Sequence, residues 1–150
     1  MKKLILLAAV VSLTVSAFSQ KRIAQVKTRE DFLNEEYCSG FFKTVDADYF
    51  DFLDDGISNS AMGYFNVLDW LQGRVAGLQI YRTRFNQSIP VIRGQVAAVF
   101  IDEIRVDYGF LTALPVTDIA MIKVIKGPFY GSWGGGGGAI AVYTRRGMDT

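Results

Sequence analysis

Five consecutive glycines, Gly134–Gly138, constrain the fold of this chain more than any other feature of its sequence. They end a glycine-dense connection, residues 127–138, between two runs of β-branched and apolar residues, Met121–Ile125 and Ala139–Thr144. Glycine accepts backbone conformations and close approaches that other residues do not. The pattern therefore predicts a strand, a turn with close backbone approach, and a second strand.

A glycine-rich loop can hold a phosphate group, but this loop lacks the features of such a site. It has no Gly-Lys-Ser/Thr ending, which a P-loop requires. Gly134, Gly136 and Ala139 satisfy a dinucleotide-binding spacing, as any run of five glycines followed by Ala would. A strand follows, whereas a dinucleotide site needs the N-terminus of a helix. We interpret the loop as a structural crossover whose functional role is limited to flexibility or partner contact.

The first residues have the composition of an export signal. Lys2 and Lys3 precede an apolar run, Leu4–Val15, which is short for a membrane span. Ala17 and Ser19 are small residues at the −3 and −1 positions of a cleavage site between Ser19 and Gln20. We therefore predict a signal peptide over residues 1–19, with an N-terminal membrane anchor as the alternative. No later apolar run reaches ~18 residues, so we expect no transmembrane helix in the mature chain.

Charge and cysteine content exclude several classes of protein. The net charge is +1 and half of the residues are hydrophobic, which is not the composition of a disordered chain. Basic residues are scattered, so we expect no nucleic-acid partner. Cys38 is the single cysteine, which excludes an intramolecular disulfide. We expect it to be a small, partly buried residue, with a reactive thiol as the alternative.

The secondary structure of the segment before the first predicted strands, residues 20–56, is less clearly marked by the sequence. Gln20–Gly40 is polar and predicts a flexible lead with one helical turn around Asp31–Tyr37. Apolar residues in Phe41–Gly56 recur at helical spacing, with aspartates between them, which predicts a helix. A calcium loop is the alternative for this segment. It fits poorly because Phe50 falls on a ligand position and Asp51 falls where the central glycine is needed.

A helix and several strands are predicted further along. Ile57–Phe65 is expected to be a loop. Asn66–Gly77 is expected to be a helix, with Asn66 as N-cap, Asp69 completing a capping box and Gly77 as the C-terminal glycine. Gly73 lies inside this helix, which suggests close packing against a sheet.

The predicted strands are Leu78–Arg82, Ile89–Arg93 and a hairpin, Ala97–Ile101 with Ile104–Val106. The turn of the hairpin, Asp102-Glu103, is unfavourable because a type I′ turn needs positive φ at both residues, so we expect it to be strained or longer. Pro115 suits the first turn of a short helix. The predicted fold class is α+β: a small mixed sheet of about four to six strands with two or three packed helices.

The sequence offers little for catalysis. It contains no histidine, which removes the commonest general base and most zinc sites. The carboxylate pairs Glu35-Glu36, Asp54-Asp55 and Asp102-Glu103 are sequence neighbours, and we interpret them as solvated surface. We therefore expect no enzyme activity, no cofactor and no metal.

Four segments in order resemble a known family: LQGRVAGLQIYR, VIRG, VFIDEIRV and DIAMIKVIKGPFYGSWGGGGGAIAVYTRRG. Together they resemble the plug domain of TonB-dependent outer-membrane receptors, and most closely its SusC-like branch. The resemblance covers residues 66–147, within a single plug-like domain predicted over residues 41–150. The positions that match the motifs of the family, with expected structural roles, are Gly73, Gly77, Arg93, Gly94, Asp102, Gly127, Pro128, Tyr130, Gly131 and Gly147. The chain departs from the family at Glu103, where the family usually has glycine, and in a shortened loop after Tyr81.

The resemblance implies a plug rather than a complete receptor. In the family, a barrel of many strands follows the plug, and a barrel needs about 10 residues per strand. We expect an exported, non-enzymatic module at the periplasmic face of the outer membrane or in the periplasm. It would act through protein contacts, with a separately encoded outer-membrane barrel or an envelope assembly as partner.

Two alternatives remain. One is a truncated or degenerate receptor. The other is a soluble periplasmic module that binds a small ligand, a siderophore or a glycan. In that case loop aromatics would bind the ligand, namely Tyr64, Phe85, Tyr108, Phe129 and Trp133.

Overall fold

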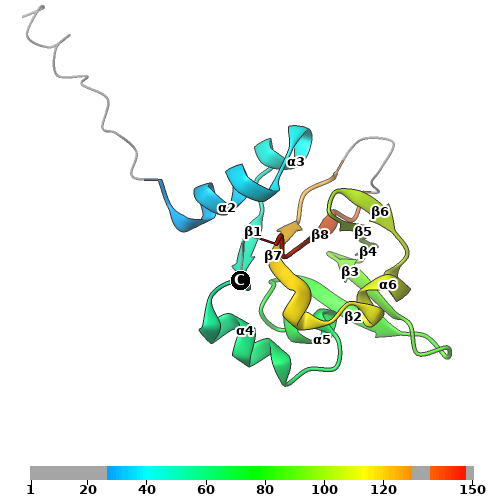
Figure 1. Cartoon of the computed structure of the whole chain (residues 1–150). Helices are drawn as coiled ribbons and strands as arrows, with labels where there is room; N and C mark the ends of the chain where they lie inside the picture. Colours follow the sequence, from blue (N-terminus) through cyan, green and yellow to red (C-terminus); the bar gives the residue numbers. More distant parts are fainter. Residues whose placement is uncertain (1–26, 130–135, 148–150) are drawn as a thin grey trace, which may run out of the picture.

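The structure is a computed structural model that describes residues 27–129 and 136–147. It has the predicted α+β class, with two sheets rather than one (Figure 1). The larger sheet has five strands in the order β1-β7-β8-β5-β6. The smaller sheet has three strands in the order β2-β3-β4. The strands are β1 (Asp48–Asp51), β2 (Leu78–Arg82), β3 (Ser88–Ile92), β4 (Gln95–Val96), β5 (Ala98–Ile101), β6 (Ile104–Val106), β7 (Ile119–Ile125) and β8 (Ala139–Thr144).

The two strands that flank the glycine connection form the centre of the larger sheet. β7 pairs antiparallel with β8 on one side and with β1 on the other. β8 pairs parallel with β5, which makes the sheet mixed. All seven residues of β7 are buried because both faces of the sheet are covered. The predicted strand, turn and strand therefore organise the whole domain.

In the part of the chain that the structure describes, five α-helices and a short 3-10 helix cover the sheets (Figure 1). The helices are α2 (Arg29–Tyr37), α3 (Gly40–Thr44), α4 (Asp55–Met62), α5 (Val67–Leu71), α6 (Tyr108–Ala113) and η1 (Val116–Asp118). Pro115 is the N-cap of η1, close to its predicted place in a short helix. No helix in the described part of the chain is long and apolar enough to cross a membrane.

The residues of β7 alternate between two hydrophobic cores. Ile122 and Val124 belong to the first core, which also contains side chains of α4, α5 and the smaller sheet. Met121 and Ile125 belong to the second core, which lies under α2 and α3. This alternation is the two-residue period of a strand buried on both faces.

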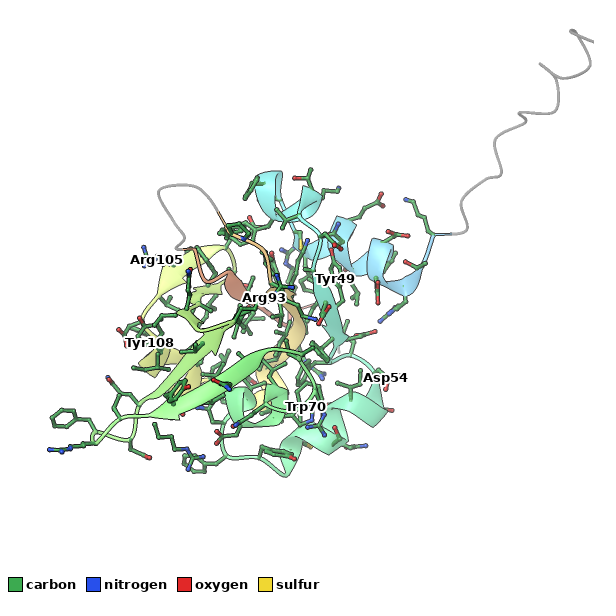
Figure 2. The ribbon with its side chains drawn as sticks, turned by 180° about the vertical axis from the view of Figure 1, so that it is seen from behind. Tyr49, Asp54, Trp70, Arg93, Arg105 and Tyr108 are labelled. Atoms are coloured by element: carbon green, nitrogen blue, oxygen red, sulfur yellow. The ribbon has the colours of Figure 1, made fainter. Side chains whose placement is uncertain are left out.

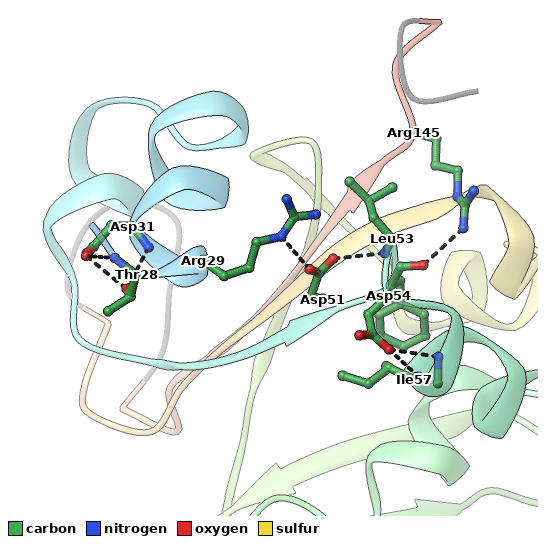
Figure 3. Close-up of polar contacts among 10 residues, drawn as sticks. Thr28, Arg29, Asp31, Asp51, Leu53, Asp54, Ile57 and Arg145 are labelled. Carbon is green, nitrogen blue, oxygen red and sulfur yellow. Dashed lines mark hydrogen bonds and ion pairs between the residues drawn. The ribbon is translucent and has the colours of Figure 1, made fainter. Parts of the chain in front are cut away.

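The predicted helix over Phe41–Gly56 is wrong. The segment contains α3 and then β1, whose residues Asp48–Asp51 pair with β7 from Val124 to Met121. Asp51 also forms an ion pair with Arg29 at 2.8 Å (Figure 3). Pairing with a central strand and contact with α2 thus override a helical spacing that involves only a few residues.

The predicted loop over Ile57–Phe65 is also wrong, because α4 occupies Asp55–Met62. Asp54 caps this helix: its carboxylate accepts hydrogen bonds from the backbone N–H groups of Gly56 at 2.7 Å and Ile57 at 3.2 Å (Figure 3). Asp54 and Asp55 are exposed, as the interpretation of solvated surface predicts, but Asp54 also begins a helix.

The helix predicted over Asn66–Gly77 is shorter than expected. Asn66 is the N-cap, since its side chain accepts a hydrogen bond from Leu68 N–H, but α5 ends at Leu71. Gly73 has a φ of 86° and therefore lies in a turn after the helix, not inside it. Asp69 does not complete the expected capping box, because its carboxylate pairs with Arg82 at 2.6 Å.

The polar lead contributes more to the core than its composition predicts. The helical turn expected around Asp31–Tyr37 is part of α2, which begins with a capping box between Thr28 and Asp31 (Figure 3). Leu33 and Tyr37 of α2 are buried in the second core. Burial of such side chains contributes about 1.5–3 kcal/mol each, so α2 is held by packing.

Candidate functional site

The glycine connection makes the close backbone approach that the sequence predicts. A Cβ atom at Gly138, which has a φ of 78°, would lie 2.2 Å from the carbonyl oxygen of Ile125. A Cβ atom at Gly137 would lie 2.4 Å from the carbonyl oxygen of Val96. Only glycine fits at these two positions, because the chain returns to β8 across the ends of β7 and β4. Tyr130 and Gly131 lie outside the described residues.

Arg93 and Gly94 form the two-residue turn between β3 and β4. Their φ values are 51° and 83°, and the flanking residues Ile92 and Gln95 are paired. The backbone N–H of Arg93 donates to the carbonyl of Gly77 at 3.0 Å. Non-glycine residues with positive φ cost of order 1 kcal/mol, so Arg93 is held in an unfavourable conformation that presents its side chain outward.

A surface hollow of about 500 Å³ brings Arg93 together with other predicted motif positions. Gly127 and Pro128 line it, as do Lys126 just after β7 and Asp48 in β1. Arg93 is labelled in Figure 2. We call it the Arg93 hollow. Lys126 pairs with Asp48 at 2.5 Å. The exposed Arg93 guanidinium has no hydrogen bond or ion pair with any of the described residues, so it is free to bind an anionic group.

The turn Asp102-Glu103 has two residues, as predicted, and both have positive φ, 47° and 68°. The strain expected for this turn is therefore present. Asp102 accepts hydrogen bonds from Thr144 N–H at 2.9 Å and from the Thr144 hydroxyl at 2.7 Å. Glu103 accepts from the backbone N–H and the hydroxyl of Ser39 and from the Tyr143 hydroxyl. Asp102 is exposed and Glu103 is half-buried, so these carboxylates lie at the surface, as expected, and in addition bond α2–α3 and β8.

Lys123 lies in the middle of β7 and is fully buried. Its ammonium group donates to Asn34 Oδ1 at 3.1 Å and to the carbonyl of Phe42, and it lies 4.9 Å from the centre of the Tyr49 ring. Burial lowers the pKa of this lysine below its usual value, because the charged form loses hydration. Sequence reasoning missed this residue, although Met121 and Ile125, two residues away on either side, predict an inward side chain.

Cys38 is buried next to Tyr143, in agreement with the interpretation as a partly buried structural residue. Burial raises the pKa of its thiol, which disfavours the reactive thiolate. Among the described residues, no group of three or more His, Cys, Asp or Glu side chains could hold a metal ion.

The aromatic residues suggested as a ligand-binding set are not gathered in one place. Tyr64 and Phe85 are exposed, and Tyr108 is half-buried. Phe129 is buried, where it packs on Phe42 and Phe100, so its proposed ligand contact is wrong. Trp133 lies outside the described residues. Phe65, which the sequence reading did not single out, is the most exposed large apolar residue among those described, at 90%.

The remaining motif positions lie apart from the Arg93 hollow. Gly73 lies in the turn after α5, and Gly147 follows β8 at an exposed position. Asp102 is in the hairpin turn between β5 and β6. The structure therefore brings Arg93, Gly127 and Pro128 together around one hollow and leaves the other motif positions within the described residues in turns.

Comparison with known families identifies the chain. The family model described as TonB-dependent Receptor Plug Domain matches residues 55–147, which is more than half of the sequence. The match begins at α4 and ends just after β8, so it contains both sheets except β1. The comparison with curated proteins finds no match.

Solved structures share the fold at low sequence identity. The RagAB peptide importer in its 'open-open' state matches with a TM-score of 0.52 and 18% identity, over 67% of this chain and 12% of that chain. A variant of the ferric enterobactin receptor PfeA of Pseudomonas aeruginosa, in complex with enterobactin, matches with a TM-score of 0.50 and 18% identity, over 67% of this chain and 17% of that chain. This chain thus spans less than a fifth of the length of either protein.

Proposed function

This chain belongs to the TonB-dependent receptor plug domain family, and from that membership we propose that it is an exported, non-enzymatic module of the outer-membrane and periplasmic envelope. In this proposal it acts through contacts with the inner wall of an outer-membrane barrel and serves nutrient uptake. Members of this family are parts of transporters rather than enzymes. The absence of histidine from the sequence agrees with a role that needs no general base.

The free guanidinium of Arg93 is the observation that favours a protein partner. Its backbone is held at a φ of 51°, and the side chain lines the Arg93 hollow without a partner among the residues described. Arginine binds carboxylates through two parallel hydrogen bonds and suits interface ion pairs. The interior of an outer-membrane barrel is polar, so it can supply such carboxylates. We propose that Arg93 pairs with acidic side chains of the barrel wall.

The finer assignments belong to the same proposal. Export rests on the signal-like residues 1–19, and the SusC-like branch rests on the order of the motifs from residue 66 to residue 147. The similarity to the RagAB peptide importer supports the plug fold and does not identify a ligand for this chain.

Site-specific crosslinking tests the proposal. A photoreactive amino acid replaces Arg93 in one variant, and in a matched control it replaces Arg84, an exposed arginine in the loop between β2 and β3. Illumination of cells that naturally carry the chain should yield an adduct with an outer-membrane protein from position 93 and little from position 84. Recovery of the chain only from the soluble periplasm, without an adduct at position 93, would refute the proposal.

A periplasmic small-ligand module is the second candidate function. It is favoured by the exposure of Tyr64 and Phe85, two of the aromatics suggested as ligand contacts. In that case the purified chain should bind a ligand without a barrel. A chain that binds no small ligand but forms the adduct at position 93 would exclude this candidate.

A further inference from the structure

Exposed aromatic side chains lie around two neighbouring hollows on one face of the domain. The first hollow, of about 340 Å³, lies between the end of α4 and the segment from α6 to η1, and its lining includes Met62, Tyr64 and Phe65. The second, of about 200 Å³, is lined by Phe65 together with Arg82 and Asn86. The two hollows share Phe65, so this surface continues from α4 to the loop between β2 and β3. We call it the Phe65 face and define it by Tyr64, Phe65, Arg74, Arg82, Arg84 and Phe85.

The loop between β2 and β3 carries Arg84 and Phe85 at its tip and projects from the domain (Figure 1). The backbone N–H of Asn86 donates to the carbonyl of Thr83 at 3.0 Å, and the N–H of Thr83 donates to the carbonyl of Gln87 at 2.9 Å. Arg84 and Phe85 are therefore the two central residues of a closed turn. The Phe85 ring is 89% exposed and contributes almost nothing to the fold.

Phe65 presents a second bare ring, which is 90% exposed. It precedes Asn66, the N-cap of α5, so its backbone is fixed by the start of that helix. Met62 and Tyr64, on the same hollow, are 52% and 41% exposed. Among the described residues, none that lines this hollow is charged. Exposed apolar groups gathered on one surface mark a site of contact with a protein or a membrane.

The charge of the Phe65 face is positive. The guanidinium of Arg74 lies over the Tyr64 ring, 5.6 Å from its centre. Neither Arg74 nor Arg84 forms an ion pair with a carboxylate in the part of the chain that the structure describes. Arg82 pairs with Asp69 at 2.6 Å, so that carboxylate is already neutralised. The face therefore has unbalanced positive charge, although the net charge of the chain is only +1.

We propose that the Phe65 face binds the surface of a membrane that contains anionic lipids. The rings of Phe65 and Phe85 enter the boundary between headgroups and acyl chains, and the arginines contact the lipid phosphates. Aromatic and basic side chains presented together hold peripheral proteins at this boundary. The polar interior of a barrel offers no apolar surface to the two rings, so a barrel contact does not account for this face.

This inference does not rest on the barrel contact proposed above. The Phe65 face and the Arg93 hollow have no residue in common. A lipid contact also yields no protein adduct, so the expected result of crosslinking from position 84 is unchanged. Failure of either proposal therefore leaves the other standing.

Co-sedimentation of the full chain with lipid vesicles tests the proposal. Vesicles of equal parts phosphatidylcholine and phosphatidylglycerol should bind the chain at least about five-fold more tightly than vesicles of phosphatidylcholine alone, because only the former carry negative charge. Added salt should reduce this difference, because it screens the arginines. Binding to neither kind of vesicle, or equal binding to both, would overturn the proposal.

Two pairs of variants compare the Phe65 face with other exposed positions, and residues 1–19 are the same in all of them. Arg84→Glu should weaken binding to the anionic vesicles at least about five-fold, and Arg105→Glu, in β6, at most about two-fold. Phe65→Ala should weaken binding at least about five-fold. Phe32→Ala, which removes a 52% exposed ring of α2, should leave binding unchanged. Equal effects within either pair would overturn the proposal.

Tryptophan fluorescence shows which surface enters the lipid. Phe65→Trp and Phe32→Trp each add one tryptophan to the natural Trp70 and Trp133. Vesicles that contain brominated acyl chains should quench the added fluorescence at position 65 and leave that at position 32 unchanged. Equal quenching at the two positions would mean that the chain binds the membrane through another surface, and it would refute the assignment to the Phe65 face.

Discussion

Glu103 and Ser39, which are 64 positions apart in the sequence, are joined by two hydrogen bonds. Glu103 Oε1 accepts from the backbone N–H of Ser39 at 2.6 Å, and Oε2 accepts from the Ser39 hydroxyl. Ser39 lies between α2 and α3, and Glu103 lies in the turn between β5 and β6. The contact therefore fastens the helices that cover the second core to an edge of the larger sheet, and it offsets the strain of a glutamate with positive φ.

The contact predicts that Glu103→Ala destabilises the domain. Alanine keeps the cost of positive φ and loses the hydrogen bonds to Ser39 and Tyr143, so we expect a loss of about 1–2 kcal/mol in the free energy of unfolding. Arg105→Ala, two residues away at an exposed position of β6, should change stability by less than about 0.5 kcal/mol. Urea denaturation measures both. Equal stabilities of the two variants would show that the Glu103 contact contributes nothing.

In the glycine connection, we expect substitutions of two glycines by alanine to change the free energy of unfolding by very different amounts. Gly138→Ala places a Cβ atom 2.2 Å from a backbone carbonyl at a φ of 78°, and we expect it to cost more than about 3 kcal/mol. Gly127→Ala meets nothing within 4 Å and should be neutral or stabilising by up to about 1 kcal/mol. Thermal unfolding of both variants checks this. A stable Gly138→Ala variant would mean that the chain does not return across the end of β7 as described.

Gly73→Ala separates conformational strain from steric contact. Gly73 has a φ of 86° but open space around its Cβ position. The variant should lose about 1 kcal/mol, between the effects of Gly127→Ala and Gly138→Ala. A neutral result would support the helix that the sequence suggested through this position.

Local sequence patterns predict the elements whose structure depends on residues close by in the sequence. β2, β7, β8 and the hairpin of β5 and β6 were predicted because apolar periodicity and turn residues mark them directly. β1 could not be predicted, because four residues without alternation become a strand only by pairing with β7. The Asp54 N-cap of α4 was a local signal that could have been recognised.

The candidate sites were predictable only in part. Close backbone approach of the glycine run follows from composition. The family resemblance singles out Arg93, Gly127 and Pro128 as separate motif positions, but only the fold places them around one hollow. The pairing of Asp69 with Arg82 could not be predicted, since the two residues come from elements joined only in three dimensions.

The predicted signal peptide gives a direct test by mass spectrometry. When the chain is exported, the mature protein should begin at Gln20, because Ala17 and Ser19 fit the −3 and −1 positions. Ser19→Phe should prevent cleavage at this bond. Ser16→Phe, at the −4 position, should be processed normally. Export of the chain with residues 1–19 still attached would favour the membrane anchor instead.

Because Lys123 is buried, we expect its contribution to the free energy of unfolding to increase as the pH rises toward 10.5. Its pKa in the folded protein is below the usual 10.5, so the folded state loses the proton first as the pH rises. Between the folded pKa and 10.5 the unfolded state binds more protons, and stability therefore increases with pH in that window. Tyr49 acts in the opposite direction: burial raises its pKa to about 12, so its contribution to stability is lost as the pH rises from 10.0 to about 12.

A comparison with Lys123→Met isolates the lysine, because Tyr49 and Cys38 remain in both proteins. The stability of the natural protein minus that of Lys123→Met should increase with pH as the pH approaches 10.5 from below. Lys43→Met, which replaces an exposed lysine of α3, serves as the control for the loss of one positive charge. Urea denaturation at each pH provides the measurement. A flat difference for Lys123→Met would mean that the ammonium group is as well hydrated in the fold as in water, which is incompatible with its burial between β7, Asn34 and Phe42.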